Sequence, residues 1–386
     1  MREPPVPFTI LHFSDLHLDA AFATSRLPAT LARQCREQLR VTLRNIVDLA
    51  KQRNVNAVTI AGDLFEREKL SPDSAAFLVQ EFERLAPIPV FIAPGNHDAA
   101  DAASLYQRGR WPENVQIAVS HTFTEWRLSP QFSLWSAGHL SPSDRHNFLS
   151  GLVLPAGSGA TARAPILLLH ASLAPAEFDN SRSHAPLTLN NIREAGFALA
   201  LLGHYHTRKV LREGSVTAVY SGSPEPLGFQ EAGEHGVTLL HLEADKEPEI
   251  EFIALAKLRF ETVEFSVAGC SQREQLIDKI LMLAAAQNYK ETFVHLRLTG
   301  EAEPALRLEL DLISNRVEKE FGFLYLENGT RPALDLQALA SEPTVRGAFL
   351  RDMLAALEKQ PEKKNLYHEA LSYGLQAFEH EDITLR

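Results

Sequence analysis

The sequence predicts an α/β protein whose sheet is covered by helices on both faces, followed by a smaller α+β unit and a helical tail. From Phe8 to about residue 245, short apolar runs alternate with helical or loop segments. The runs are apolar throughout, which is typical of strands buried on both faces. After about residue 255 the pattern changes to alternating strand-like segments and amphipathic helical ones.

Each predicted strand of the first region is rich in Val, Ile, Leu or Phe and ends in polar, Gly or Pro residues. The strands are Phe8–Phe13, Asn56–Ala61, Val90–Ala93, Ile166–Leu169, Ala198–Leu202, Thr217–Tyr220 and Val237–Leu242. Between the first two, apolar residues at helical spacing predict a helix over Pro28–Lys51, and a second helix is expected over Pro72–Leu85.

The second region is predicted to hold strands at Phe260–Val267 and Thr292–Thr299 with a helix at Gln272–Ala286 between them. Two amphipathic helices are expected in the tail, at Thr344–Leu357 and Leu366–Phe378. The predicted domains are therefore residues 1–254, 255–335 and 336–386. A length of 386 residues is consistent with two or three domains.

Composition excludes several classes of protein. With 45% hydrophobic and 23% charged residues, the chain is neither disordered nor collagen-like. Its two cysteines, Cys35 and Cys270, form no CxxC pair, which excludes thiolate zinc sites and a disulfide framework. The first residues have no apolar leader and no run approaches the roughly 18–20 residues of a membrane span. We expect a cytoplasmic protein without a membrane segment.

Five short polar motifs each follow the carboxyl end of a predicted strand, where ligands bind in layered α/β proteins. They are Ser14-Asp15-Leu16-His17, Gly62-Asp63, Pro94-Gly95-Asn96-His97-Asp98, His170 and Gly203-His204-Tyr205-His206. Taken singly, each has an ordinary explanation as a turn, a helix cap or a buried histidine. Together they form a set of carboxylate, amide and imidazole donors without thiolate, which suits Mn²⁺, Fe²⁺ or Zn²⁺.

These motifs, in this order, resemble the calcineurin-like metallophosphoesterase superfamily. Gly62-Asp63-Leu64-Phe65, Ala200–His206 and Tyr220–Glu225 are most similar to its DNA-repair nuclease branch, the SbcD-like and YhaO-like exonucleases. The resemblance implies a four-layer αββα sandwich with a smaller α+β capping domain and a helical C-terminal tail. It also implies an exonuclease or endonuclease in DNA repair that hydrolyses phosphodiester bonds by a metal-activated hydroxide.

The resemblance further implies two divalent ions, with manganese favoured over iron or zinc. It places Asp15, His17 and His206 on one ion and Asn96, His170 and His204 on the other, with Asp63 bridging them. A carboxylate is suited to bridging because it offers one oxygen to each cation.

The same family pattern assigns His97 as a histidine that binds no metal and protonates the leaving oxygen. Asp98 is expected to hold the His97 imidazole. One position departs from the pattern, since many nucleases of this branch carry a second active-site histidine where this chain has Glu66. A carboxylate there would repel phosphate, so we expect slow DNA cleavage by the isolated chain. His184, in a predicted loop, is the candidate to take over the role of this missing second histidine.

A formal net charge of −11 opposes nucleic-acid binding, so DNA must meet a local basic surface, the metal ions or a partner. The candidate surface is a stripe on the first helix, formed by Arg33, Arg36, Arg40 and Arg44. The resemblance implies a partner as well, an SbcC-like coiled-coil ATPase that would bind the tail helices, and it leaves a homodimer open. Packing of those helices on the body of the protein is the alternative.

Two other functions compete with a DNA nuclease. A phosphoesterase for small substrates such as nucleotides is favoured by the acidic balance, whereas the capping-like region and the Gly-Ser-Pro-Glu segment argue against it. A non-catalytic scaffold with the same fold is the other alternative. The presence of all seven candidate ligands and of His97 argues against a scaffold.

Overall fold

The structure is a computed structural model that describes residues 7–23, 26–154, 164–173, 183–244, 246–303, 306, 308–332, 336–360 and 363–378. The chain forms two compact units. The first comprises Met1–Val263, Gln287–His295 and Glu318–Tyr325, and the second comprises Glu264–Ala286, Leu296–Val317 and Leu326–Arg386. The domain boundaries expected from the sequence stay a prediction.

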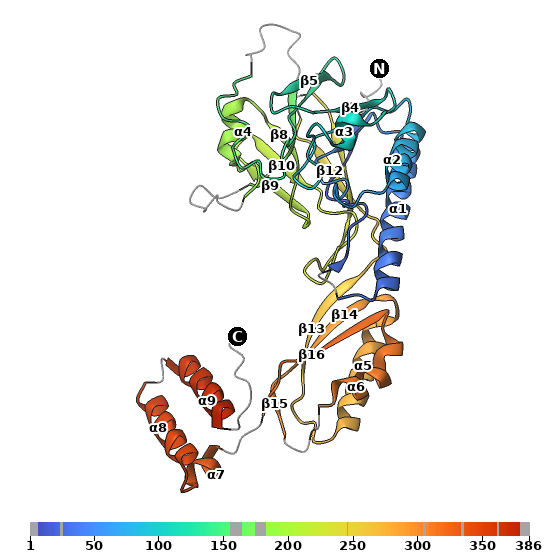
Figure 1. Cartoon of the computed structure of the whole chain (residues 1–386). Coiled ribbons are helices and arrows are strands. Elements are labelled where there is room, and N and C mark those ends of the chain that lie inside the picture. The colour runs from blue at the N-terminus through green and yellow to red at the C-terminus, as the bar shows by residue number, and fades with distance from the viewer. Residues whose placement is uncertain are drawn as a thin grey trace, which may run out of the picture. The chain divides into compact units, whose positions relative to one another are not determined.

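Two six-stranded sheets form most of the first unit (Figure 1). The first sheet consists, in spatial order, of β12 (Glu249–Ala254), β11 (Gly236–Leu242), β1 (Phe8–Phe13), β2 (Ala57–Ile60), β3 (Val90–Ile92) and β4 (Val115–Ile117). The second consists of β5 (Thr124–Arg127), β6 (Phe132–Ser136), β7 (Ala164–His170), β8 (Leu199–Gly203), β10 (Val216–Tyr220) and β9 (Lys209–Glu213).

Strands β1 to β4 run parallel to one another, and so do β6, β7, β8 and β10. Register is set by pairs such as Ile10 with Ala57 and Ile166 with Leu199. Because parallel strands end at the same edge of a sheet, the loops after β1, β2 and β3 lie together, and so do those after β7 and β8.

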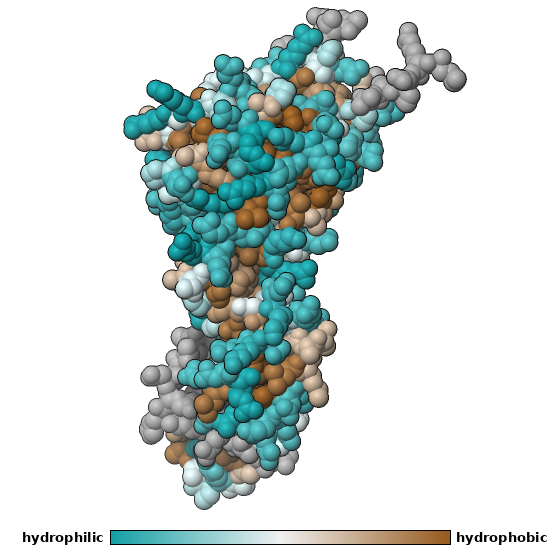
Figure 2. Space-filling view, turned by 90° about the vertical axis from the view of Figure 1, so that its right-hand side faces the viewer, coloured by the Kyte–Doolittle hydropathy of each residue, from teal (hydrophilic) through white to brown (hydrophobic). Residues whose placement is uncertain are grey.

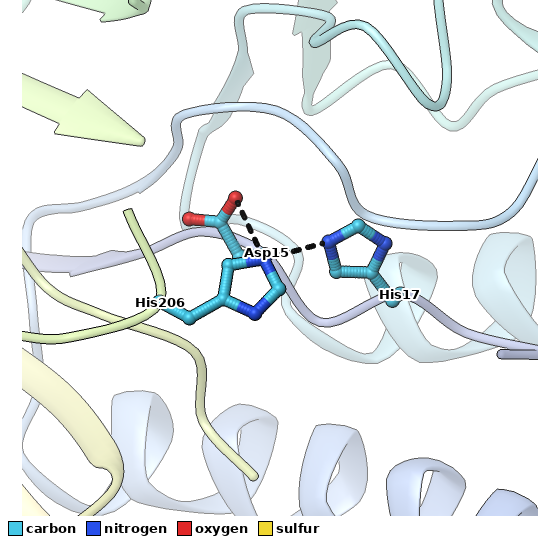
Figure 3. A group of neighbouring side chains, drawn as sticks. All are labelled: Asp15, His17 and His206. Atoms are coloured by element: carbon cyan, nitrogen blue, oxygen red, sulfur yellow. Dashed lines mark hydrogen bonds and ion pairs between the residues drawn. The ribbon is translucent and has the colours of Figure 1, made fainter. Parts of the chain in front are cut away.

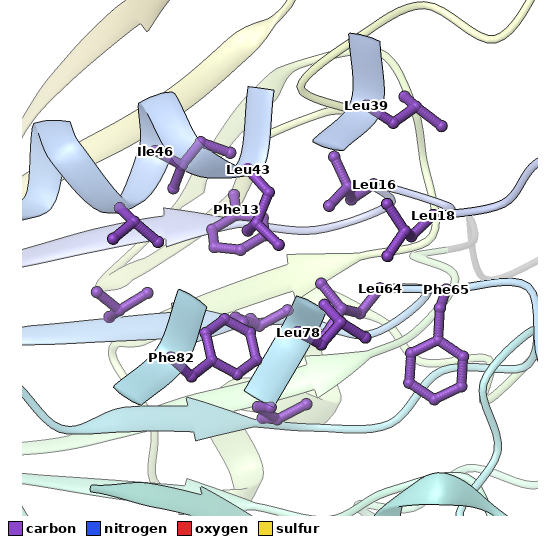
Figure 4. Close-up of a cluster of buried hydrophobic side chains, with 14 of the residues drawn as sticks. Phe13, Leu16, Leu18, Leu39, Leu43, Ile46, Leu64, Phe65, Leu78 and Phe82 are labelled. Carbon is purple, nitrogen blue, oxygen red and sulfur yellow. The ribbon is translucent and has the colours of Figure 1, made fainter. Parts of the chain in front are cut away.

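Helices α1 (Ala29–Gln52) and α2 (Pro72–Arg84) cover one face of the first sheet. Their buried side chains, among them Leu43 and Phe82, pack with Phe13 of β1 in one apolar cluster (Figure 4). On the second sheet, Ile192 of the short helix α4 (Leu189–Ala195) packs with Leu167 of β7. The short helix α3 (Leu105–Arg108) also belongs to this unit.

A third apolar cluster fills the space between the two sheets. It joins residues such as Ile10 and Phe91 of the first sheet to Ile166 and Leu201 of the second. The order of layers is therefore helix, sheet, sheet, helix, which confirms the predicted four-layer arrangement. Strands β4, β5, β6, β9 and β12 were not predicted. Four of them, β4, β5, β9 and β12, lie at sheet edges, where strands lack a continuous apolar run. Strand β6 is buried, but two serines interrupt its apolar residues.

The α+β segment contains β13 (Phe260–Ser266), α5 (Arg273–Gln287), β14 (Phe293–Thr299), α6 (Leu310–Val317) and β16 (Phe323–Asn328). Its three strands form a sheet in the order β13-β14-β16. Shorter elements are the 3₁₀ helices η3 (Tyr289–Glu291) and η4 (Glu318–Glu320) and the paired strands β15 (Glu301–Ala302) and β17 (Arg331–Pro332).

The tail consists of α7 (Leu336–Ser341), α8 (Val345–Lys359) and α9 (Lys364–Phe378). Leu350 of α8 and Leu371 and Leu375 of α9 are buried together, so these helices bury part of their apolar faces against each other. Val345 and Leu366 stay exposed, at 75% and 61% of their surface.

Within the described residues, no helix combines the length and the apolarity needed to cross a membrane. On the face shown in Figure 2, hydrophilic residues predominate and hydrophobic ones lie among them in small groups.

Candidate metal centre

The loops after β1, β2, β3, β7 and β8 carry the motifs singled out from the sequence, and backbone hydrogen bonds join them. Asp15 N donates to Gly62 O at 3.0 Å and His17 N donates to Asp63 O at 2.9 Å. The second sheet is joined to the first because His204 N donates to both carboxylate oxygens of Asp15, at 3.1 Å each. Residues from both sheets thus meet at one site.

The backbone at this site is strained. Asp15, His17, Asp63 and His204 have positive φ angles of 55°, 48°, 51° and 106°, which cost non-glycine residues free energy and cluster at functional sites. Gly62, with φ of 79°, allows the loops to approach closely, since a Cβ there would lie 2.7 Å from the Gly95 Cα and from His170 Nδ1.

The first group of side chains is Asp15, His17 and His206 (Figure 3). His17 Nε2 lies 3.2 Å from His206 Nε2, and His206 Nε2 lies 4.0 Å from an oxygen of Asp15. Asp15 and His17 are buried, with 0% and 2% of their surface exposed.

Each histidine of this first group is held by a glutamate. His17 Nδ1 donates to Glu66 at 2.9 Å and His206 Nδ1 donates to Glu231 at 2.7 Å. When Nδ1 of a neutral imidazole carries the proton, Nε2 carries a lone pair. When both imidazoles are neutral, the two Nε2 atoms face each other as acceptors and fit a cation. Burial opposes protonation of His206, but the hydrogen bond to Glu231 outweighs it and raises the pKa to about 9, so a cation would have to displace a proton there.

Asp63 lies between the first group and a second one. Its Oδ2 is 3.7 Å from His17 Nε2 and 3.4 Å from His170 Nε2, while its Oδ1 accepts from His97 N at 2.8 Å. Burial raises the pKa of Asp63 to about 7, because a charged carboxylate is unfavourable there without a cation.

The second group contains His170 and Asn96. His170 Nδ1 donates to the carbonyl oxygen of Ala61 at 2.8 Å, so its Nε2 is an acceptor. That Nε2 lies 3.0 Å from Asn96 Oδ1, which is also an acceptor, and near Asp63. Three acceptors thus converge here as well, and these residues fit a second cation.

His204 belongs to the same side of the site, its ring centred 5.2 Å from that of His170. Burial lowers the pKa of His204 to about 3 and that of His170 well below the ordinary histidine value. Both imidazoles are therefore neutral at physiological pH, the form in which histidine binds metal.

His97 is 45% exposed and lines a pocket with Glu66, Arg67, Glu68, Lys69, Asn96 and Pro142. Its Nδ1 lies 3.1 and 3.2 Å from the two oxygens of Glu66. This hydrogen bond raises the pKa of His97 to about 9. For Glu66, burial opposes ionisation, but the hydrogen bonds from His17 and His97 outweigh it and hold the pKa below its usual range.

The expected role of Asp98 needs correction. Its carboxylate is fully buried and accepts from the backbone N–H groups of Asp63, Leu64 and Gly95 and from the Tyr106 hydroxyl, at 2.6–3.1 Å. Among the described residues, Glu66 rather than Asp98 holds the His97 ring. Asp98 follows His97 directly, but it faces inward, where the amides of two loops converge.

Sequence reasoning missed Glu231 and misjudged Glu66. Glu66 does not face the substrate side as a free anion, since imidazoles bind both of its oxygens. Glu231 also accepts from Leu227 N at 3.0 Å. No local sequence pattern marks Glu231 as a partner of His206.

The proposed DNA-contacting arginines have different surroundings. Arg40 pairs with Asp73 at 2.7 Å, and Arg44 lies 3.6 Å from Glu81 with its guanidinium over the Phe77 ring, so both join α1 to α2. Arg36 instead lines a pocket with Lys69 and Asp19.

Arg33 is exposed on α1. His184 lies beside the metal centre, its ring centred 5.4 Å from that of His204.

Comparisons with known proteins identify the family to which the chain is similar. The model of the calcineurin-like phosphoesterase family matches residues 8–222. The uncharacterized metallophosphoesterase YhaO of Bacillus subtilis is 28% identical over 301 residues, which are 76% of this chain and 69% of that protein. The DNA double-strand break repair protein Mre11 of Sulfurisphaera tokodaii is 25% identical over 322 residues, 79% of this chain and 78% of that protein.

Among solved structures, a dimetal phosphatase from Danio rerio aligns with 64% of this chain and 96% of that chain, at 13% identity and a TM-score of 0.38. The family match covers more than half of the chain and includes every strand end that contributes to the site. The chain therefore belongs to the calcineurin-like phosphoesterase family.

Proposed function

We propose that this protein is a phosphodiesterase that uses two divalent metal ions, manganese best, and that its substrate is DNA. Family membership supports a metal-dependent hydrolase. The observation that carries the two-ion proposal is the position of Asp63 Oδ2, 3.7 Å from His17 Nε2 in one group of acceptors and 3.4 Å from His170 Nε2 in the other.

In this proposal Asp15, His17 and His206 hold one ion, and Asn96, His170 and His204 hold the other, with Asp63 shared. The imidazole, amide and carboxylate donors suit manganese, iron or zinc. We prefer manganese on the resemblance to the repair nucleases.

The chain's own residues then have distinct tasks. The ions, when bound, would activate water and neutralise charge on the phosphoryl oxygens. In hydrolysis the water oxygen adds to phosphorus, one water proton passes to solvent, and the P–O bond to the leaving group breaks. His97, from Nε2 in the pocket, donates the proton that the leaving oxygen takes.

Two observations favour DNA as the substrate. The relative from Sulfurisphaera tokodaii is a DNA double-strand break repair protein. In addition, Lys69 lines the His97 pocket, together with Glu66, Glu68 and an Arg67 that pairs with Asp101 at 2.6 Å, and it also lines the neighbouring pocket of Arg36. Lys69 and Arg36 give a chain of net charge −11 local positive charge on which phosphates can bind. Arg33 and His184 are further proposed contacts, whereas Arg40 and Arg44 are engaged within the protein.

The direct test compares three substrates after the protein is stripped with a chelator and reloaded. These are end-labelled duplex DNA, bis(p-nitrophenyl) phosphate and a nucleoside monophosphate. We expect manganese to restore cleavage of the DNA and the chromogenic diester, with slower restoration by iron or zinc. Restoration of monoester hydrolysis alone would favour the small-substrate phosphoesterase, which the acidic balance of the chain supports. No activity together with no bound metal would favour the scaffold.

We also propose that the tail binds an SbcC-like coiled-coil ATPase. Val345 at the start of α8 and Leu366 in α9 remain exposed although the tail helices bury other apolar residues together. Truncation after Pro332, or the pair Val345→Asp and Leu366→Asp, should abolish co-purification with the ATPase and leave diester hydrolysis intact. Retention of the ATPase by both variants would contradict this proposal. A homodimer and a cytoplasmic location stay predictions from the sequence.

A further inference from the structure

Glu66 touches two histidines that have different tasks. Its Oε1 lies 2.9 Å from Nδ1 of His17, in the first metal group. Nδ1 of His97, beside the pocket, lies 3.1 Å from the same Oε1 and 3.2 Å from Oε2. The carboxylate is 18% exposed. Its backbone is fixed as well, because Glu66 N donates to Leu18 O at 2.9 Å.

Glu231 provides a contrast within the same site. It too accepts from Nδ1 of a histidine in the first group, His206, at 2.7 Å, and it is also 18% exposed. Its other oxygen, however, accepts from Leu227 N and Ser223 Oγ, at 3.0 and 3.3 Å. Of the two glutamates, only Glu66 therefore connects the metal centre to the pocket.

We propose that Glu66 is a positioning residue that aligns the proton donor His97 with the metal centre through its shared contact with His17. Its Oε1 accepts from His17 Nδ1, so that Nε2 of His17 faces the first metal position. Both oxygens hold Nδ1 of His97, so that Nε2 of His97 faces the pocket. The distance between the two working nitrogens is thereby set by one rigid carboxylate.

This inference rests on the proposed function, in which the leaving oxygen receives its proton from His97 as its bond to phosphorus breaks. A misdirected His97 ring slows that step only where the leaving group needs the proton. An alkoxide such as a deoxyribose oxygen needs it, whereas p-nitrophenolate is stable enough to leave without it. The effect of Glu66 on turnover should therefore depend on the leaving group.

The kinetic experiment compares Glu66→Gln with the matched variant Glu231→Gln at saturating manganese, on thymidylyl-thymidine and on bis(p-nitrophenyl) phosphate. We expect Glu66→Gln to lower kcat about 10–100-fold on the dinucleotide and only a few-fold on the chromogenic diester. Glu231→Gln should change kcat on the two substrates by the same factor. The double variant Glu66→Gln with His97→Ala should be no slower on the dinucleotide than His97→Ala alone.

A second readout requires no turnover. In calorimetric titrations with manganese, both glutamine variants should bind the metal about 10–100-fold more weakly than the wild type, because each loses a carboxylate that orients a ligand histidine. His97→Ala should bind manganese as the wild type does.

The outcomes separate the two proposals. If the wild type hydrolyses diesters but Glu66→Gln slows both substrates equally, or adds its full effect to that of His97→Ala, the positioning role of Glu66 is wrong and the proposed function stands. If the wild type hydrolyses neither diester, the proposed function falls. The calorimetric titration then tests Glu66 by itself. If Glu66→Gln binds manganese with the affinity of the wild type, the positioning role of Glu66 is wrong.

Discussion

The two halves of the proposed metal centre use the same kinds of donor but are supported differently. In the first half, Glu66 and Glu231 hold the Nδ1 atoms of His17 and His206. In the second half, the neutral carbonyl of Ala61 holds Nδ1 of His170. A carboxylate increases the basicity of the imidazole it binds more than a carbonyl does, so similar ligands acquire different strengths as metal donors.

The pKa values of the histidines differ in the same way. For His206, burial opposes protonation, but the hydrogen bond to Glu231 outweighs it and the pKa is raised to about 9. For His204, burial is the main influence and the pKa is lowered to about 3. The comparison teaches that the anionic surroundings of an imidazole, and not only its burial, decide how strongly it attracts a cation or a proton.

The largest effect is expected from replacing Asp63, the residue that the two halves share. Asp63→Ala should eliminate both ions together and lower diester hydrolysis by roughly 10³-fold or more, because Asp63 lies beside ligands of both groups. Metal analysis by mass spectrometry, with Asp48→Asn on the exposed side of α1 as control, provides the measurement. Near-normal metal content in Asp63→Ala would show that the two halves are independent.

The next effect separates chemistry from metal binding. His97→Ala should retain both ions and lose about 10²–10⁴-fold in kcat on DNA, the usual contribution of a positioned proton donor. Metal content and turnover are measured on the same preparation. Loss of one ion would instead make His97 a ligand and extend the first half to include it.

The difference between the halves is itself measurable. Among the described residues, the glutamates that hold candidate ligand histidines both lie in the first half, so we expect the two manganese ions to bind in separate steps, with affinities that differ by about 10–100-fold. Calorimetric titration of the stripped protein resolves the steps. Two sites of equal affinity would contradict the inference that histidines held by Glu66 and Glu231 bind metal more strongly than the histidine held by the Ala61 carbonyl.

The smallest effect concerns stability rather than metal. His12, in β1, is fully buried and lies 3.3 Å from the carbonyl oxygen of Leu202 in the other sheet. Burial lowers its pKa from 6.5 to about 4. As the pH falls, His12 is therefore protonated in the unfolded chain before it is protonated in the folded one. The contribution of neutral His12 to the free energy of unfolding is complete above pH 6.5 and is lost as the pH falls towards 4.

The loss amounts to about 3 kcal/mol at most. Denaturant unfolding of the metal-free protein at pH 7.5 and pH 4.5 should show a larger decrease for the wild type than for His12→Asn. Equal decreases would assign the acid sensitivity to the histidines of the metal centre.

Much of the two-sheet sandwich follows from the sequence alone. Short apolar runs and helical spacing locate β1, β2, α1 and α2 almost to the residue, because burial on both faces leaves a continuous apolar signature. The same runs place the candidate metal ligands, since each follows a strand directly. Edge strands such as β5 and β9 were not predicted, because they are half exposed and contain both polar and apolar residues.

The residues that support the candidate metal ligands could be identified only from the folded structure. Glu66 is 49 residues from His17 in the sequence and Glu231 is 25 residues from His206, so no local spacing connects them. Neighbourhood in the sequence suggested Asp98 for His97, whereas the loop turns Asp98 towards the amides of Asp63, Leu64 and Gly95. Metal ligands follow from where strands end, but their partners depend on which loops the closed sandwich brings within hydrogen-bond distance.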